Sequence, residues 1–126
     1  MSETAQGLAA DGLEPFDPAT ALERLDGDEE LLRDVVELVE DEWRRQSKAI
    51  ESAIQRADVS AVAAAAHSLK GAVGQLFPAG HADGMARVEQ AARAGDLVTA
   101  EASWRSATPR IQSFLAGAGR WARGGR

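Results

Sequence analysis

Residues 58–78, which read DVSAVAAAAHSLKGAVGQLFP, decide the fold. Apolar side chains recur in this stretch at alternating steps of three and four residues, the spacing that places them on one face of an α-helix. These positions are Val59, Val62, Ala66, Leu69, Val73 and Leu76. Asp58 is a favourable N-cap, and Pro78 ends or kinks the helix because the residue before a proline is pushed out of the α region. The stretch therefore predicts an amphipathic helix that packs one face against other helices.

A short helix and a long helix are predicted before this stretch. Asp17 as N-cap and Pro18 at the first helical position start the short helix, which runs to about Leu25. Asp28 caps the long helix, whose apolar positions follow steps of three, four and seven residues. These positions are Leu32, Val36, Val39, Trp43, Ile50 and Ile54. They form a single stripe, which predicts a second core-facing helix.

Two more helices are predicted after residue 78. The first covers about 82–94 and ends at Gly95, and its inward residues are Met85, Val88 and Ala92. The second begins at Asp96, and its seam consists of Leu97, Trp104, Ile111, Phe114 and Leu115. Pro109 lies inside this pattern, so we expect a kink there or a restart capped by Thr108.

Strand-like alternation nowhere extends beyond a few residues, so the chain is predicted to be all-α. Short loops between amphipathic helices are typical of an up-and-down antiparallel four-helix bundle, here with a short extra N-terminal helix. We expect the bundle to span residues 16–118. A flexible arm at 1–15 and a flexible, Gly- and Arg-rich tail at 119–126 would flank it. We expect a monomer, because the seams face one another.

Composition excludes several classes of protein. The chain of 126 residues is too short for a kinase, and the absence of Cys excludes disulfides, thiolate zinc sites and Cys nucleophiles. The net charge of −6 argues against nucleic-acid binding. No apolar run approaches the roughly 20 residues of a membrane span. The N-terminus also lacks the basic and apolar regions of a secretory signal. We therefore expect a cytoplasmic protein that binds neither nucleic acid nor membrane.

His67 points away from the apolar seam of its helix. At about 100° per residue, it lies about 130° from the centre of the seam and should face solvent. Its neighbours on that face are small, namely Ser60, Ala63, Ala64, Gly71 and Gly74. Glycine inside a helix costs about 1 kcal/mol relative to alanine. Close approach of another surface would explain that cost.

Lys70 lies three residues after His67 and within reach of it on the same face. A neutral imidazole near pH 7 is nucleophilic, and a lysine beside it would stabilise an anion such as a phosphoryl group. Nothing nearby supplies a carboxylate to orient a general base, and the only other histidine is His81. Hydrolytic triads and metal sites are therefore poor fits. We predict a phosphorylatable histidine on a flat helical surface.

Residues 66–72, AHSLKGA, resemble the His-x-Leu-Lys-Gly signature of histidine phosphotransfer (Hpt) domains. The similarity continues at residues 16–17 and 22–32, which look like the opening of such domains. Residues 89–97 look like the segment that follows the phosphorylated helix. The resemblance covers about residues 16–116.

The resemblance implies a phosphocarrier without kinase activity of its own. His67 would accept a phosphoryl group from the aspartyl phosphate of a receiver domain and pass it to another receiver. Lys70 would stabilise the phosphate, and Gly71 would leave room for the receiver. The expected partners are response-regulator receivers and a hybrid sensor histidine kinase. The Mg²⁺ used in transfer would belong to the receiver, so this chain is expected to need no cofactor or metal.

The chain departs from the family pattern at Phe77-Pro78. The family usually has a second Gly six residues after the motif Gly, followed by a small residue. Phe77 could pack inward on the following helix or contribute an apolar contact to the receiver.

Two other functions stay open. A phosphorylation-independent module could use the same surface to hold or inhibit a receiver, although an intact His67 and Lys70 favour the carrier. A substrate domain of a chemotaxis-type kinase would be phosphorylated directly by an ATP-binding domain. That class normally stands at the start of a long kinase chain. These 126 residues contain no ATP-binding domain, so this function ranks below the other two.

Overall fold

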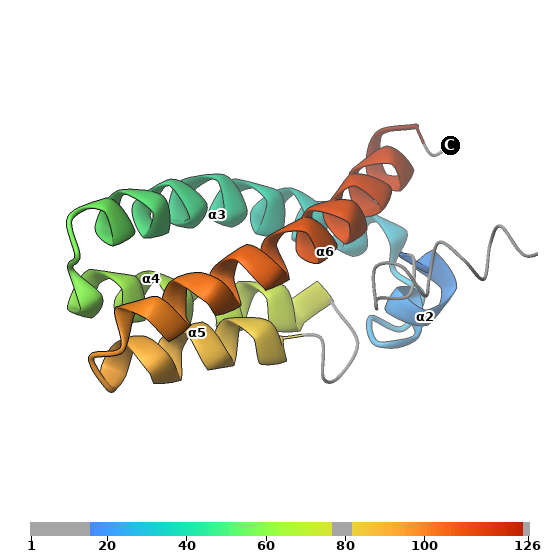
Figure 1. Cartoon of the computed structure of the whole chain (residues 1–126). Coiled ribbons are helices and arrows are strands. Elements are labelled where there is room, and N and C mark those ends of the chain that lie inside the picture. Colours follow the sequence, from blue (N-terminus) through green and yellow to red (C-terminus); the bar gives the residue numbers. More distant parts are fainter. Residues whose placement is uncertain (1–15, 77–81, 125–126) are drawn as a thin grey trace, which may run out of the picture.

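The structure is a computed structural model that describes residues 16–76 and 82–124 (Figure 1). This part of the chain is helical and contains no strand. Its helices are α2 (Pro18–Glu23), α3 (Glu29–Gln55), α4 (Val59–Leu76), α5 (Asp83–Arg93) and α6 (Leu97–Gly124). The predicted all-α class is confirmed. In the described ranges, no helix has the length and apolar character needed to cross a membrane.

Aspartates mark the helix starts, as the sequence predicts. Each carboxylate accepts a hydrogen bond from a backbone N–H two or three residues along, at 3.0 or 3.1 Å. The four capping residues are Asp17, Asp28, Asp58 and Asp96. Gly27 and Gly95 adopt the left-handed conformation, with φ of 77° and 78°, and turn the chain between helices. Local chemistry therefore sets most of the helix boundaries.

The long helices surround one core. α3 packs on α4, α4 on α5, α5 on α6 and α6 on α3, and successive helices run in opposite directions (Figure 1). Every predicted seam residue of α3 and α5 is buried. The seams of α4 and α6 are buried except at their first residues, Val59 and Leu97, which are half-buried. Trp43 stacks on Trp104 with 5.5 Å between ring centroids, so both lie in the core as predicted.

Gly84 allows α5 to lie close to α6. A Cβ placed on Gly84 would come within 2.8 Å of the Ala107 Cβ, a distance that real side chains do not tolerate. The close approach fixes the position of α5 in the bundle. α5 also packs on α4 along another side.

Helix α6 lacks the restart that was one of the two expectations at Pro109. It runs through the proline without a restart. Proline has no N–H to donate to the carbonyl four residues earlier. The Thr108 hydroxyl does not cap a new helix but donates to the Trp104 carbonyl at 2.7 Å. Burial of Ala107 and Ile111 on either side holds this part of α6 against the core.

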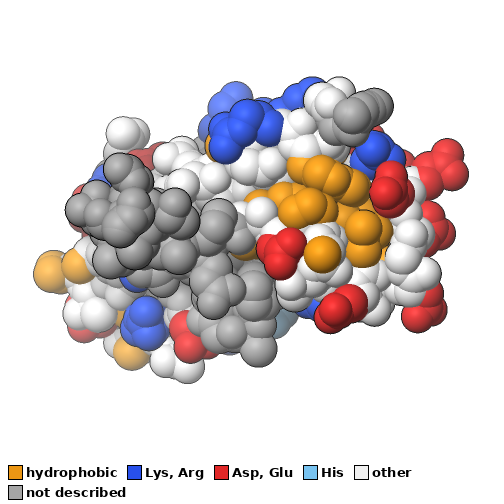
Figure 2. Space-filling view, turned by 90° about the vertical axis from the view of Figure 1, so that its right-hand side faces the viewer, with side chains coloured by type: hydrophobic (Ala, Val, Ile, Leu, Met, Phe, Trp, Pro, Cys, Tyr) orange, Lys and Arg blue, Asp and Glu red, His pale blue; other side chains and the backbone are white. Residues whose placement is uncertain are grey.

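The end of α6 also differs from the flexible tail expected from residue 119, because it stays helical to Gly124. The ring centroids of Trp121 and Phe16 are 5.9 Å apart. The Arg33 guanidinium lies over the Trp121 ring, 4.9 Å from its centroid. Arg123 pairs with Glu40 at 3.2 Å. These contacts fasten the last turns of α6 to α3. Figure 2 views this end of the molecule, where hydrophobic side chains gather next to acidic ones.

Candidate functional site

His67 projects from α4 with 63% of its side chain exposed. Its Nδ1 lies 3.0 Å from Oε2 of Glu89, which comes from α5. A carboxylate accepts hydrogen bonds, so Nδ1 carries the proton in this contact and the lone pair of the neutral ring is on Nε2. No residue in the described ranges hydrogen-bonds to Nε2. The site therefore presents one oriented nucleophilic nitrogen.

Glu89 is the centre of a charged cluster. Only 8% of its side chain is exposed. Lys70 Nζ lies 3.0 Å from Oε1, and Arg93 donates to Oε2 from Nε at 2.9 Å and from Nη2 at 2.6 Å. Hydrogen bonds from Lys70, then Arg93, and the weaker one from His67 lower the pKa of Glu89 to about 2, although burial opposes them. Glu89 is thus a buried, ionised carboxylate at neutral pH.

The expectation that no carboxylate lies near His67 was wrong. Glu89 is 22 residues away along the chain and reaches His67 only because α5 packs on α4. A signal for it exists in the sequence. Glu89 shares the inward face of α5 with Met85, Val88 and Ala92. An acid on an apolar face needs partners, because burying an unpaired charge is costly.

The family profile of the Hpt domain matches residues 34–118. This range covers more than half of the chain and includes His67, Lys70 and Glu89. The chain belongs to the Hpt domain family. The predicted resemblance is thereby confirmed, and with it a role in histidine phosphotransfer and two-component signalling. No curated protein and no solved structure matches the chain.

The small side chains around His67 in this Hpt domain are mostly exposed, as predicted. Ser60, Ala64, Gly71 and Gly74 lie at the surface. Ala63 does not, since only 7% of it is exposed. Val59 and Ala66, which lie four residues before and three residues after Ala63, both belong to the seam of α4. Ala63 therefore lies at the edge of the core. Phe77, the remaining predicted partner residue, lies outside the described residues.

The glycines of the Hpt motif region are not required by the packing of the domain itself. A Cβ placed on Gly71 or Gly74 would meet no atom of the described residues within 4 Å. The Gly74 carbonyl cannot accept the usual helical hydrogen bond from the residue four positions later, because that residue is Pro78 and proline has no N–H. Arg24 donates to that carbonyl instead, at 3.3 Å. As far as the described residues are concerned, the space above both glycines is open to another molecule.

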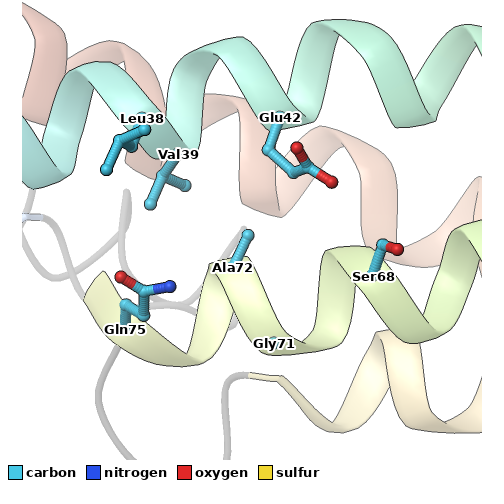
Figure 3. A pocket seen from close by; sticks show the side chains of 7 residues that line it. All are labelled: Leu38, Val39, Glu42, Ser68, Gly71, Ala72 and Gln75. Atoms are coloured by element: carbon cyan, nitrogen blue, oxygen red, sulfur yellow. The ribbon is translucent and has the colours of Figure 1, made fainter.

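A groove of about 390 Å³ runs between α3 and α4 beside this open face (Figure 3). Its lining residues are Leu38, Val39, Glu42, Ser68, Gly71, Ala72 and Gln75. Leu38 is 63% exposed, although large aliphatic side chains are usually buried. Gly71 is one helical turn from His67, so the groove and the nucleophile belong to one continuous surface.

The Hpt site has no set of side chains that resembles a metal centre. Across residues 16–76 and 82–124, no three His, Asp or Glu side chains group as ligands. Glu89 is occupied by cationic partners, and His67 offers a single nitrogen. The chemistry of the site is that of a nucleophile with charged neighbours.

Proposed function

We propose that this Hpt domain accepts a phosphoryl group on Nε2 of His67 from the aspartyl phosphate of a receiver domain and passes it to another response-regulator receiver. The observation that carries the proposal is the contact between His67 Nδ1 and Glu89, which leaves the Nε2 lone pair exposed. The proposal places the protein within a phosphorelay as a carrier. It needs no kinase activity of its own.

The chemistry of the step balances without a separate base. The Nε2 lone pair attacks phosphorus, a P–N bond forms, and the P–O bond to the aspartate breaks. The aspartate leaves as a carboxylate. The proton on Nδ1 stays in the hydrogen bond to Glu89, so the ring gains a positive charge that this carboxylate stabilises. The reverse step delivers the phosphoryl group to the second receiver.

Lys70 is suited to the phosphoryl group itself. Its side chain is 39% exposed, and it shares the Glu89 carboxylate with His67. A phosphoryl group brings a charge of about −1.5 to −2, which attracts a mobile ammonium group. Phosphoryl transfer depends mainly on positioning and charge stabilisation, and both residues contribute to these.

The docking face in this proposal is the exposed side of α4 together with the groove against α3. The open space above Gly71 and Gly74 supports close approach of a receiver, and Leu38 offers it an apolar contact. The receiver would supply Mg²⁺ from its own acidic pocket. The helix pairing supports an up-and-down four-helix bundle. In this proposal the bundle acts as a cytoplasmic monomer between a hybrid sensor kinase and a response regulator.

The test is phosphotransfer from a panel of labelled, phosphorylated receiver domains to wild type and to His67→Gln. We expect acid-labile, base-stable label on wild type and none on His67→Gln. The label should then move from wild type to a second receiver. Receiver binding without any label would overturn the carrier role. It would indicate instead a module that holds a receiver independently of phosphorylation.

A further inference from the structure

We propose that Arg93 is a positioning residue that takes over the Glu89 carboxylate when Lys70 moves to the phosphoryl group on His67. The inference rests on the proposed function and extends it to a residue outside the signature motif. It concerns the exchange of partners that phosphorylation imposes on the site. Its basis is the unequal sharing of the two Glu89 oxygens.

The two oxygens of Glu89 have different partners. Lys70 Nζ is the described partner of Oε1, at 3.0 Å. Oε2 accepts hydrogen bonds from His67 Nδ1 and from two nitrogens of Arg93, Nε and Nη2. If Lys70 moved to a phosphoryl group, Oε1 would lose this partner. Water could not easily replace it, because only 8% of the Glu89 side chain is exposed. Leaving a buried charge partly unpaired is strongly unfavourable, so without a replacement Lys70 would remain on Glu89.

Arg93 is built to be that replacement. Its guanidinium is a planar fork that can bind both oxygens of one carboxylate. It lies four residues after Glu89 on the same helix, so it keeps its position relative to the carboxylate. Its side chain is 62% exposed, which leaves room for the small rotation that would bring a donor to Oε1.

The charges of the site support the same exchange. Lys70 and Arg93 face a single carboxylate, so the cluster around a neutral His67 carries one excess positive charge. A phosphoryl group adds nearly two negative charges, and phosphorylation makes the ring positive. The phosphorylated cluster is then close to neutral. Without Arg93, the buried carboxylate and the phosphoryl group would compete for one lysine.

The test compares full-length wild type with Arg93→Gln, Arg93→Lys and the control Arg87→Gln. Arg87 is exposed on the same helix and makes no ion pair within the described chain. Each protein is phosphorylated by a labelled receiver and, separately, by phosphoramidate, a small donor that cannot dock. We expect Arg93→Gln to slow phosphorylation about three- to tenfold with both donors, the scale of one partly exposed charged hydrogen bond. Arg93→Lys should recover part of the rate, and Arg87→Gln should match wild type.

A second comparison tests whether Arg93 acts through Glu89. In a Glu89→Gln background, adding Arg93→Gln should have no further effect on the rate. The inference would be overturned if Arg93→Gln slowed phosphorylation equally with Glu89 and with Gln at position 89. It would also be overturned if Arg93→Gln slowed phosphorylation by the receiver but not by phosphoramidate. Either result would indicate that Arg93 is a docking contact. Label on wild type with no change in Arg93→Gln would overturn it while sparing the proposed function. No label on wild type from either donor would overturn both.

Discussion

Nδ1 of His67 lies 3.0 Å from Oε2 of Glu89, and the two residues belong to different helices. The proposed nucleophile is therefore oriented before any partner arrives. The carboxylate that orients it is itself held by Lys70 and Arg93. The proposed reactive unit of this Hpt domain extends beyond the signature motif on α4 to a second helix.

Replacing Glu89 with Gln tests the orientation directly. The amide keeps the size but removes the charge, and its NH₂ group can donate to Nδ1, which would move the ring proton to Nε2. We expect phosphorylation of His67 to slow by about ten- to a hundredfold, as for loss of a hydrogen bond to a charged group. Glu101→Gln, at an exposed ion pair on α6, is the control. An unchanged rate for Glu89→Gln would show that orientation does not limit the reaction.

The stability of the same variant should depend on pH differently from that of wild type. The pKa of Glu89 is lowered from 4.5 to about 2, so its contribution to stability is complete above pH 4.5 and is lost as the pH falls toward 2. Wild type should therefore be more stable than Glu89→Gln at neutral pH, and the difference should shrink between pH 4.5 and pH 2. Urea unfolding at a series of pH values measures this. A difference that stays constant over that range would contradict the assigned ion pairs.

The glycines of α4 should separate stability from transfer. Gly71→Ala and Gly74→Ala add a Cβ in open space, so each should raise the free energy of unfolding by about 0.5–1 kcal/mol. Gly84→Ala, which would press on Ala107, should instead lower it by about 1–3 kcal/mol.

Gly74→Arg should fold normally yet block transfer from a receiver. Normal transfer by Gly74→Arg would refute close approach at this face.

Leu38 should act as a docking contact. Because its side chain is 63% exposed, Leu38→Ser should leave the free energy of unfolding within about 0.5 kcal/mol of wild type. Its affinity for a receiver should fall about tenfold, as for a central apolar contact in an interface. Val98→Ser is the matched control, at an apolar residue that is 80% exposed on α6. Equal losses of affinity in both variants would place the receiver elsewhere.

The C-terminal turns of α6 should contribute to stability. A chain that ends at Ala118 loses Trp121 and its contacts with Phe16 and Arg33. We expect thermal unfolding to show a loss of about 1–3 kcal/mol, the value for burying a large apolar side chain. A chain that ends at Gly124 should match the full-length protein. If both shortened chains were equally stable, the last turns would be dispensable.

The helices and the core could be predicted because their signals are local. Asp17, Asp28 and Asp58 bond to backbone groups within three residues, and apolar periodicity identifies the buried face of each helix. The motif likewise places His67 and Lys70 on one face of α4. Each of these inferences needs only the neighbouring residues.

The remaining features depend on contacts between helices. Glu89 reaches His67 only after α5 has packed on α4. The Gly-rich end of α6 reads as flexible until the contacts of Trp121 and Arg123 with the rest of the domain are known. Ala63 lies at the edge of the seam, where the closeness of neighbouring helices decides its burial. Local patterns do not contain these distances.

The split of the reactive unit between α4 and α5 also makes the chemistry conditional on folding. An unfolded chain contains both His67 and Glu89, but it does not hold the Glu89 carboxylate against Nδ1 of His67. If His67 is the acceptor, as proposed, we expect such a chain to accept a phosphoryl group more slowly than the folded domain. The hydrogen bond to Glu89 would thus tie the reactivity of His67 to correct assembly of the domain.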